Sequence, residues 1–246
     1  MTIADRLKKV SARIQQSQLN SGNLTCSGKK RPNYNFSNDF NGLNGSVKLL
    51  AVSKTHPATA IQEGFDAGIT EFAESYLQEA EIKIKQSSHL NIVWHFIGPI
   101  QSNKTRLIAS LFDWVQSVDR VKILQRLNDQ RPAKKPPINI CIQVNYFNEK
   151  NKQGANIQEV PELLELASKS PNINLRGLMF IPLKQKKYES QLEQLLEIKA
   201  YYEKVRTQYT RLDTLSMGMS NDLEAAITAG SSMVRIGTDI FGKRRP

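Results

Sequence analysis

Short apolar runs recur along the chain and alternate with longer segments of helical periodicity. The first of these runs, Leu49–Val52, has four consecutive apolar residues, which is typical of a strand buried on both faces. Seven further strands are expected at residues 69–72, 91–97, 114–118, 137–144, 175–181, 212–216 and 232–236. Segments with apolar residues at helical spacing lie between nearly all of them, the longest at about 188–208.

This alternation of strands and helices predicts an α/β fold with a parallel sheet, because parallel neighbours need a crossover helix between them. Eight such units predict one domain over residues 1–246, folded as a single (β/α)8 TIM barrel. The alternative is an open doubly wound sheet, but no glycine-rich dinucleotide fingerprint follows any of the strands. We therefore expect a barrel.

The amino-terminal segment has a different pattern. Apolar residues from Ile3 to Ile14 fall on one face at helical spacing, which predicts an amphipathic helix over residues 1–14. A targeting peptide would have a similar pattern, but Asp5 and the ordinary core stripe favour a helix of the fold. Residues 15–45 are rich in asparagine, serine and glycine without sustained periodicity, and we expect them to form a flexible insertion loop.

Composition narrows the class of protein. The 246 residues are 39% hydrophobic and 23% charged, as expected of a globular protein. No apolar run is long enough to span a membrane, and the amino terminus lacks the apolar region of a signal peptide. The two cysteines, Cys26 and Cys141, have no metal-type neighbours, so reduced thiols in the cytoplasm are the simplest interpretation.

The net charge of +11 raises the question of nucleic-acid binding. The basic residues are scattered, however, and neither aromatic interleaving nor a helix-turn-helix pattern accompanies them. We therefore expect solvated basic faces and no nucleic-acid partner. The three histidines have no ligand spacing to one another, so no metal site is expected.

One candidate for chemistry stands directly after the first strand. Lys54 is two residues past Val52 and is followed by Thr55-His56-Pro57, where the strand is expected to pass into a helix. The simplest interpretation is that Lys54 ends the strand and reaches into solvent. A desolvated lysine at this place could instead lose its proton and attack a carbonyl carbon to form a Schiff base. The strand alone favours the first interpretation.

Two loops at the same end of the expected barrel favour the second interpretation, in which Lys54 forms a Schiff base. Residues 216–222 follow the seventh strand and residues 235–242 follow the eighth, where barrels of this type often bind a phosphate. Small residues there let backbone N–H groups approach an anion, and Ser216 and Thr238 add hydroxyl donors. Each loop alone could be a simple turn or a helix cap. Together with Lys54 across the mouth, the loops predict a site for a phosphate and an aldehyde.

The motifs around these residues are similar to those of one known family. The matching stretches, in chain order, are Ala51–Thr55, Trp94–Lys104, Gly177–Pro182, Leu215–Ser220 and Met233–Thr238, with Phe241-Gly242 at the end. Through them the chain resembles the pyridoxal phosphate homeostasis proteins, which are single-domain relatives of the alanine racemase barrel. The resemblance implies an alanine racemase N-terminal-domain-like barrel.

By that resemblance, Lys54 binds pyridoxal 5'-phosphate (PLP) as a Schiff base. Ser216, Gly237 and Thr238 fall where the family binds the phosphate. Arg235 falls where the related racemases face the pyridine nitrogen. A guanidinium keeps its proton, so Arg235 could donate a hydrogen bond to that nitrogen without protonating it. From the residues alone, Arg235 could equally belong to a structural ion pair.

The chain departs from the family pattern at two positions. Ser75 stands where relatives usually have an asparagine close to the cofactor, and Asp239 stands where they often have a small residue. The first departure leaves the role of Ser75 open. A carboxylate at position 239 would be unfavourable beside a phosphate unless it points away or lies at a helix N-terminus.

The implied function is intracellular PLP homeostasis by a non-catalytic protein that holds and delivers the cofactor. A racemase needs an acid or base on each face of the substrate's α-carbon, and in two-domain relatives a tyrosine of a carboxyl-terminal domain supplies the second. This chain ends at Pro246, just after the eighth strand, which favours a carrier. The alternatives are a PLP-dependent amino-acid racemase or decarboxylase, and a barrel that binds a sugar phosphate without a Schiff base. We expect a cytoplasmic monomer, with PLP-dependent apoenzymes as candidate partners.

Overall fold

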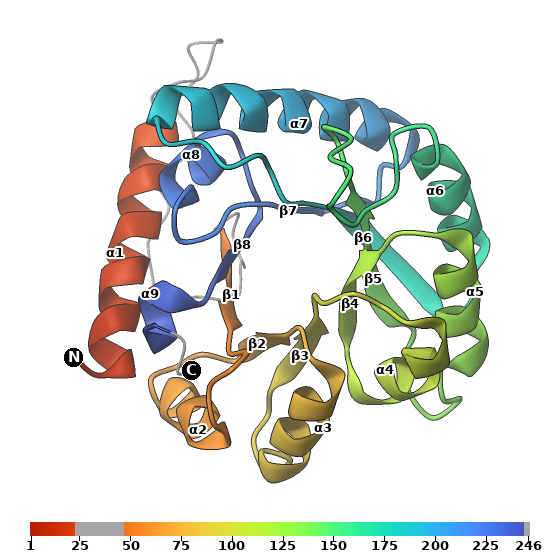
Figure 1. The fold of residues 1–246 in the computed structure, drawn as a ribbon, viewed down its shortest axis with the longest axis horizontal. Coiled ribbons are helices and arrows are strands. Elements are labelled where there is room, and N and C mark those ends of the chain that lie inside the picture. Colours follow the sequence, from red (N-terminus) through yellow and green to blue (C-terminus); the bar gives the residue numbers. More distant parts are fainter. Residues whose placement is uncertain (23–46, 244–246) are drawn as a thin grey trace.

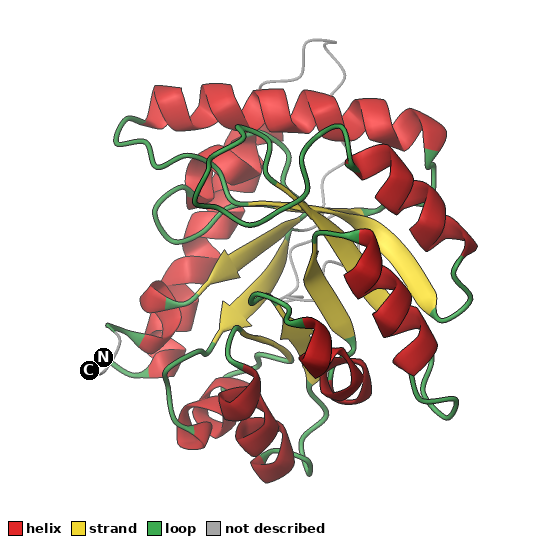
Figure 2. Ribbon diagram, turned by 45° about the vertical axis from the view of Figure 1, so that its right-hand side comes forward, coloured by secondary structure: helices red, strands yellow, loops and turns green. Residues whose placement is uncertain are grey.

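The computed structural model describes residues 1–22 and 47–243. Within these residues, eight parallel strands close into a barrel, and helices surround it (Figures 1 and 2). The strands are β1 (Lys48–Val52), β2 (Glu71–Glu74), β3 (Val93–Phe96), β4 (Trp114–Val118), β5 (Ile138–Val144), β6 (Ile173–Phe180), β7 (Thr214–Ser216) and β8 (Met233–Ile236). The helices are α1 (Ile3–Gly22), α2 (Ala58–Asp66), α3 (Leu77–Gln86), η2 (Ser102–Lys104), α4 (Thr105–Leu111), α5 (Val121–Gln130), α6 (Val160–Lys169), α7 (Tyr188–Gln208), α8 (Leu223–Thr228) and α9 (Thr238–Phe241). The prediction of a single (β/α)8 barrel is confirmed.

The barrel closes where β8 pairs with β1. Leu50 of β1 lies opposite Arg235 of β8 in the register of this pair. The first and last strands are therefore neighbours, as the orange β1 and the blue β8 show in Figure 1, and the loops that follow them meet at the carboxyl end of the barrel. This closure brings Lys54 close to residues 237–242, although they are far apart in the sequence.

Buried apolar side chains form two layers, one on each face of the barrel wall. Leu49 and Ala51 of β1 join the large cluster that packs against the helices. Leu50 and Val52 belong instead to a smaller cluster with Met233 of β8. Alternate residues of a strand point to opposite faces, and both faces of β1 are buried. Burial on both faces explains why this strand appears in the sequence as an uninterrupted apolar run.

The amino-terminal helix is longer than its pattern predicts. Helix α1 continues to Gly22, so residues 15–22 are helical and the prediction of a loop is wrong for this part. Ser17 is buried three residues after Ile14 and extends the face that packs against α8 and α9. The sequence pattern does not predict this extension, because the periodicity of apolar residues ends at Ile14. The rest of the expected loop, residues 23–46, lies outside the described residues.

Strand β2 begins two residues later than predicted and places charged side chains in the barrel wall. It spans Glu71–Glu74, and the side chains of both glutamates are buried. The other strands begin within two residues of their predicted starts. None of the helices in the described ranges is both long and apolar enough to cross a lipid bilayer.

Candidate functional site

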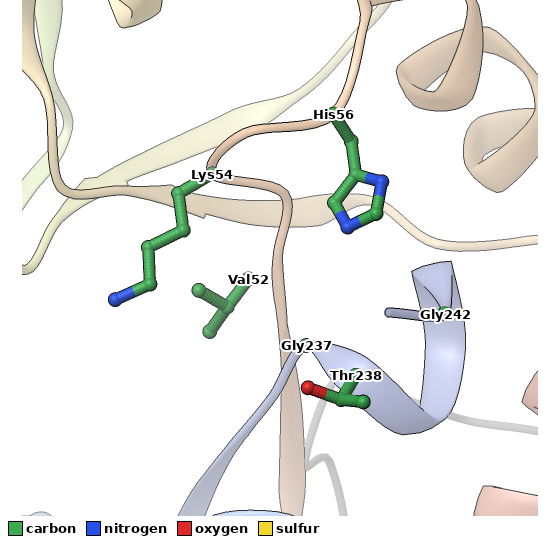
Figure 3. Close-up of a pocket in the computed structure, with 6 residues that line it drawn as sticks. All are labelled: Val52, Lys54, His56, Gly237, Thr238 and Gly242. Carbon is green, nitrogen blue, oxygen red and sulfur yellow. The ribbon is translucent and has the colours of Figure 1, made fainter. Parts of the chain in front are cut away.

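A small hollow opens at the carboxyl end of the barrel, between the end of β1 and the start of α9. Its lining residues are Val52, Lys54, His56, Gly237, Thr238 and Gly242. Figure 3 shows the Lys54 side chain to the left of Val52, with the Thr238 hydroxyl and the His56 imidazole to its right. The structure thus brings together three of the residues that the sequence singles out, Lys54, Gly237 and Thr238.

The start of α9 offers hydrogen-bond donors to an anion in this hollow. Thr238 is its first residue, and the first N–H groups of a helix have no intrahelical acceptor. A Cβ on Gly237 would stand 3.0 Å from the carbonyl oxygen of Val52, so the backbone here approaches β1 more closely than a residue with a side chain normally would. The cavity has a volume of about 30 Å³. One water needs roughly 10–15 Å³ on this scale, so the hollow suits a phosphate-sized group better than an aromatic ring.

Arg13 of α1 holds together the two loops beside this hollow. Its Nη1 donates to Asp239 Oδ2 at 2.5 Å, and its Nε donates to Glu224 Oε1 at 2.6 Å. Its Nη2 donates to the carbonyl oxygen of Ser220 at 3.1 Å. The Asp239 carboxylate, which would be an unfavourable neighbour for a phosphate, is thereby paired with a cation. This pairing accounts for the departure from the family pattern at position 239.

The same contacts place the backbone of Ser220, a residue that the sequence prediction leaves out of the site, beside the start of α9. Arg13 bonds to both the Ser220 carbonyl and Asp239, so Ser220 lies beside the start of α9. The loop around Ser220 is fixed by Asp222, whose Oδ1 accepts the Met219 N–H at 2.6 Å. The position of Ser220 in the loop after the seventh strand is a signal that could have included it. We add Ser220 to the candidate phosphate ligands.

Ser216 and Arg235 lie deeper, inside the barrel. Arg235 Nη1 donates to Ser216 Oγ at 2.7 Å, and its Nη2 donates to the carbonyl oxygen of Phe180 at 2.8 Å. The Ser216 hydroxyl is fully buried and donates in turn to Gln116 Oε1 at 2.7 Å. The structure therefore groups Ser216 with Arg235 rather than with the residues that line the hollow.

Arg235 is a buried cation whose hydrogen-bond acceptors are neutral. Its side chain is 5% exposed, and among the described residues it forms no ion pair. Burial lowers the pKa of Arg235 to about 10, which still leaves the guanidinium charged at neutral pH. A guanidinium has five N–H donors, and the two hydrogen bonds described above leave others for a further acceptor. The structural ion pair considered from the sequence is therefore absent from the described residues.

A cluster of buried charges holds the backbone next to Lys54. Lys83 Nζ donates to the carbonyl oxygen of Ser53 at 2.8 Å. It also donates to Glu74 Oε1 and to Glu79 Oε1, each at 2.6 Å. All three N–H donors of the ammonium group thus have an acceptor, although the lysine is only 3% exposed. The sequence gives no signal for this cluster, because its members come from β2 and α3 and are not adjacent to Lys54 in the chain.

The other side of Lys54 is held by the same cluster. Thr55 has a φ of 66°, a left-handed conformation that is costly for a β-branched residue. Its N–H donates to Glu79 Oε1 at 2.6 Å. Lys54 therefore stands between two residues that Glu79 and Lys83 fix directly.

Ser75, just after β2, packs its backbone against Gly98, where a Cβ would stand 2.0 Å from the Ser75 carbonyl oxygen.

Comparison with known proteins gives one consistent result. The family model of the alanine racemase N-terminal domain matches residues 33–245. The pyridoxal phosphate homeostasis protein of Vibrio alginolyticus is 54% identical over 203 residues, which cover 81% of this chain and 87% of the relative. The protein of the same name from Pseudomonas aeruginosa is 46% identical over 243 residues, covering 99% and 96%.

A solved structure agrees with these relatives. PipY of Synechococcus elongatus PCC7942, whose structure contains bound PLP, superposes with a TM-score of 0.80 at 29% sequence identity. The superposition covers 98% of this chain and 100% of PipY. The chain therefore belongs to the pyridoxal phosphate homeostasis proteins, which are built on the alanine racemase N-terminal domain.

Proposed function

We propose that this protein binds PLP as a Schiff base on Lys54 and serves intracellular PLP homeostasis by holding and delivering the cofactor. The observation that carries the proposal is that Lys54 and the start of α9 line one hollow. An amine that can bond to an aldehyde and a set of donors that suit a phosphate are thus next to each other. The names of the relatives and the PLP in the PipY structure support the same ligand.

The residues of the site take separate roles in this proposal. Gly237, Thr238 and the first N–H groups of α9 hold the phosphate, together with the Ser220 hydroxyl. Arg235 lies below the mouth as a buried cation and donates a hydrogen bond to the ring nitrogen. Ser216, expected from the sequence to bind the phosphate, supports Arg235 instead, because its hydroxyl is bonded to that guanidinium.

With Arg235 as the partner of the ring nitrogen, the site favours holding PLP over catalysing the turnover of amino acids. Bound PLP supplies an aldehyde for the amine and a ring that withdraws electrons. The Arg235 guanidinium keeps its proton at neutral pH, since burial lowers its pKa only to about 10. A ring nitrogen that accepts a hydrogen bond without a proton is a weaker electron sink than a protonated one. The site therefore favours a stable complex over chemistry at the α-carbon of an amino acid.

The proposal extends to where and with what the protein acts. We propose a cytoplasmic monomer that passes PLP to PLP-dependent apoenzymes. Cys141 is fully buried, and burial raises the pKa of its thiol to about 12, so this cysteine stays protonated and unreactive.

The first prediction tests the covalent ligand. Protein freed of cofactor and mixed with PLP should show a visible absorption band that borohydride reduction removes. Mass spectrometry should then find the reduced cofactor on the peptide that contains Lys54. Lys54→Ala should lose the band while its circular dichroism stays that of the wild type, because the residue lies past the end of β1. A Lys54→Ala variant that keeps the full band would contradict the assignment.

The same preparation separates the alternatives. A barrel for sugar phosphates would show no visible band with PLP at any concentration that saturates a specific site. A racemase or decarboxylase would show the band and, in deuterated water, Lys54-dependent exchange of the α-proton of amino acids or release of carbon dioxide at ordinary enzyme rates. The carrier shows the band and only residual exchange.

The second prediction concerns the phosphate. Thr238→Val should weaken the retention of PLP by about 1.5–3 kcal/mol, the usual contribution of a hydrogen bond to a charged group. Its effect on pyridoxal, which lacks the phosphate, should be much smaller. Equilibrium dialysis with both ligands measures the difference, and Thr238→Ser, which keeps the hydroxyl, is the matched control. Equal losses for PLP and pyridoxal would place the phosphate elsewhere.

A further inference from the structure

A line of hydrogen-bonded polar side chains crosses the interior of the barrel below Arg235. It consists of Arg235 (β8), Ser216 (β7), Gln116 (β4), His95 (β3), Glu71 (β2) and Lys48 (β1). The successive donor–acceptor distances from Arg235 to Lys48 are 2.7, 2.7, 3.0, 3.0 and 2.7 Å. Lys48 and Glu71 are the first residues of their strands, so the line runs from beneath the mouth to the opposite end of the barrel. We call it the interior polar line.

The donors and acceptors of this line fit together with one assignment of protons, which begins at Arg235. A guanidinium can only donate, so Ser216 Oγ accepts from Arg235 and gives its own proton to Gln116 Oε1. The NH2 group of Gln116 then faces His95 Nδ1, which must accept and carries no proton. His95 Nε2 therefore carries the proton and donates to Glu71. One tautomer of His95 satisfies the whole line.

The surroundings of His95 favour that neutral tautomer. The ring is fully buried and stacks on Trp114 with a centroid distance of 5.1 Å and an interplanar angle of 15°. Burial lowers the pKa of His95. Burial alone would raise the pKa of Glu71, but the hydrogen bond from His95 and the charge of Lys48 lower it, so that carboxylate is ionised. An ionised acceptor at Nε2 fixes the proton on that nitrogen.

We propose that Gln116 and His95 are positioning residues that hold Arg235 under the cofactor site. The unprotonated Nδ1 of His95 orients the Gln116 amide so that its oxygen, not its nitrogen, faces Ser216. Were the amide reversed, its NH2 group would face Ser216 and compete with Arg235 for the same hydroxyl oxygen. The tautomer of His95 thereby controls the position of the Arg235 guanidinium beneath the mouth of the barrel. This inference rests on the proposed function only for the role of Arg235 toward the ring nitrogen.

The test begins without cofactor, so that it is independent of PLP binding. Nitrogen-15 NMR of the cofactor-free protein at neutral pH should show His95 protonated at Nε2 and unprotonated at Nδ1. Side-chain NMR should also show the Arg235 guanidinium protons protected from solvent exchange. Gln116→Met, which has a similar shape but offers only a weakly accepting thioether in place of the amide, should speed that exchange at least about tenfold, because one buried hydrogen bond is lost. Ser216→Ala should give the same acceleration, and it can replace Gln116→Met in the exchange measurement if the methionine variant does not fold.

The comparison variant is Gln116→Glu, which still presents an oxygen to Ser216 but has no N–H for His95 Nδ1, so in this variant the ring is expected to take up a proton at that nitrogen. It should keep the Arg235 protons protected, and a merely structural role of Gln116 would not distinguish it from the methionine variant. A His95 protonated at Nδ1 in the wild-type protein, or equal acceleration in Gln116→Met and Gln116→Glu, would overturn the proposal. With PLP present, Gln116→Met should also shift the visible band and its pH titration, whereas Gln116→Glu should shift them less. A protein that fails to bind PLP would refute the proposed function and leave the cofactor-free results to decide on the positioning role.

Discussion

Replacement of Lys83 by methionine should destabilise the folded protein by about 3–5 kcal/mol, the usual cost of removing one partner of a buried ion pair. The lysine is 3% exposed and its ammonium group bonds to Glu74, Glu79 and the Ser53 carbonyl. Without it, the fully buried Glu74 keeps one hydrogen bond, from the Ser53 hydroxyl. Its Oε2 has no hydrogen-bond partner among the described residues even in the intact protein. An uncompensated carboxylate would remain in the barrel wall.

The loss should depend on pH in a defined direction. Burial already raises the pKa of Glu74, and removal of the Lys83 charge would raise it further. A carboxyl whose folded pKa lies above its unfolded value favours the folded state in acid and loses that contribution as the pH rises through the folded pKa. The difference in free energy of unfolding between wild type and Lys83→Met should therefore be smaller at about pH 5 than at about pH 8.

Urea unfolding at these two pH values measures the effect. Lys85→Met, an exposed lysine on the same helix, is the matched control and should change stability by no more than about 0.5 kcal/mol. Adding Glu74→Gln to Lys83→Met should restore part of the stability and remove the pH dependence, because the buried charge is gone. If the double variant were as unstable as the single one, the cause would be lost packing rather than an unpaired carboxylate.

Gly177→Ala should destabilise the folded protein at least as much as Lys83→Met does, for a different reason. Gly177 of β6 pairs with Thr214 of β7, and a Cβ on it would stand 1.7 Å from the Thr214 carbonyl oxygen. The clashing atom belongs to the backbone of the paired strand, so no side-chain rotation can relieve it. We expect β7 to be forced away from β6, with a loss above about 4 kcal/mol, which single substitutions rarely exceed.

Chemical unfolding followed by circular dichroism measures this loss, or shows that no folded protein accumulates. Gly64→Ala in α2 is the matched control. Its added Cβ would stand 3.1 Å from the end of the Phe72 side chain, which would have to shift by only a few tenths of an ångström, and alanine has the higher helix propensity. The control should remain within about 1 kcal/mol of the wild type. A Gly177→Ala protein as stable as this control would show that the two strands can separate at little cost.

The barrel is predictable from the sequence because its strands are buried on both faces. Each such strand leaves an uninterrupted apolar run, and the closed order of the strands then places the first and eighth loops together. Lys54, Gly237 and Thr238 meet in one hollow for this reason. Their roles toward PLP remain predictions. The prediction that Ser216 binds the phosphate differs from the grouping of its hydroxyl with Arg235, because the pattern that correctly ends the strand at Ser216 does not show where its side chain points.

The polar contacts inside the barrel cannot be predicted from the same hydrophobic patterns. Glu74, His95 and Gln116 are polar residues within short buried strands, and hydrophobicity indicates neither which face they occupy nor what they contact. Their partners are set by the closure of the barrel: the bond between Ser216 and Gln116 joins residues 100 positions apart. The length of α1 is missed for a related reason, since the buried Ser17 has no apolar signature.

The contacts of Arg13 have a consequence for the order in which the protein can acquire its ligand. This residue of the first helix bonds to Glu224 and Asp239, which follow it by 211 and 226 positions in the chain. Contacts between such distant positions form late, because the loop between them must close first. The loop after β7 and the start of α9 are therefore held together only once α1 has packed against them. A complete anion site would thus require the first helix and the last two loops to have assembled.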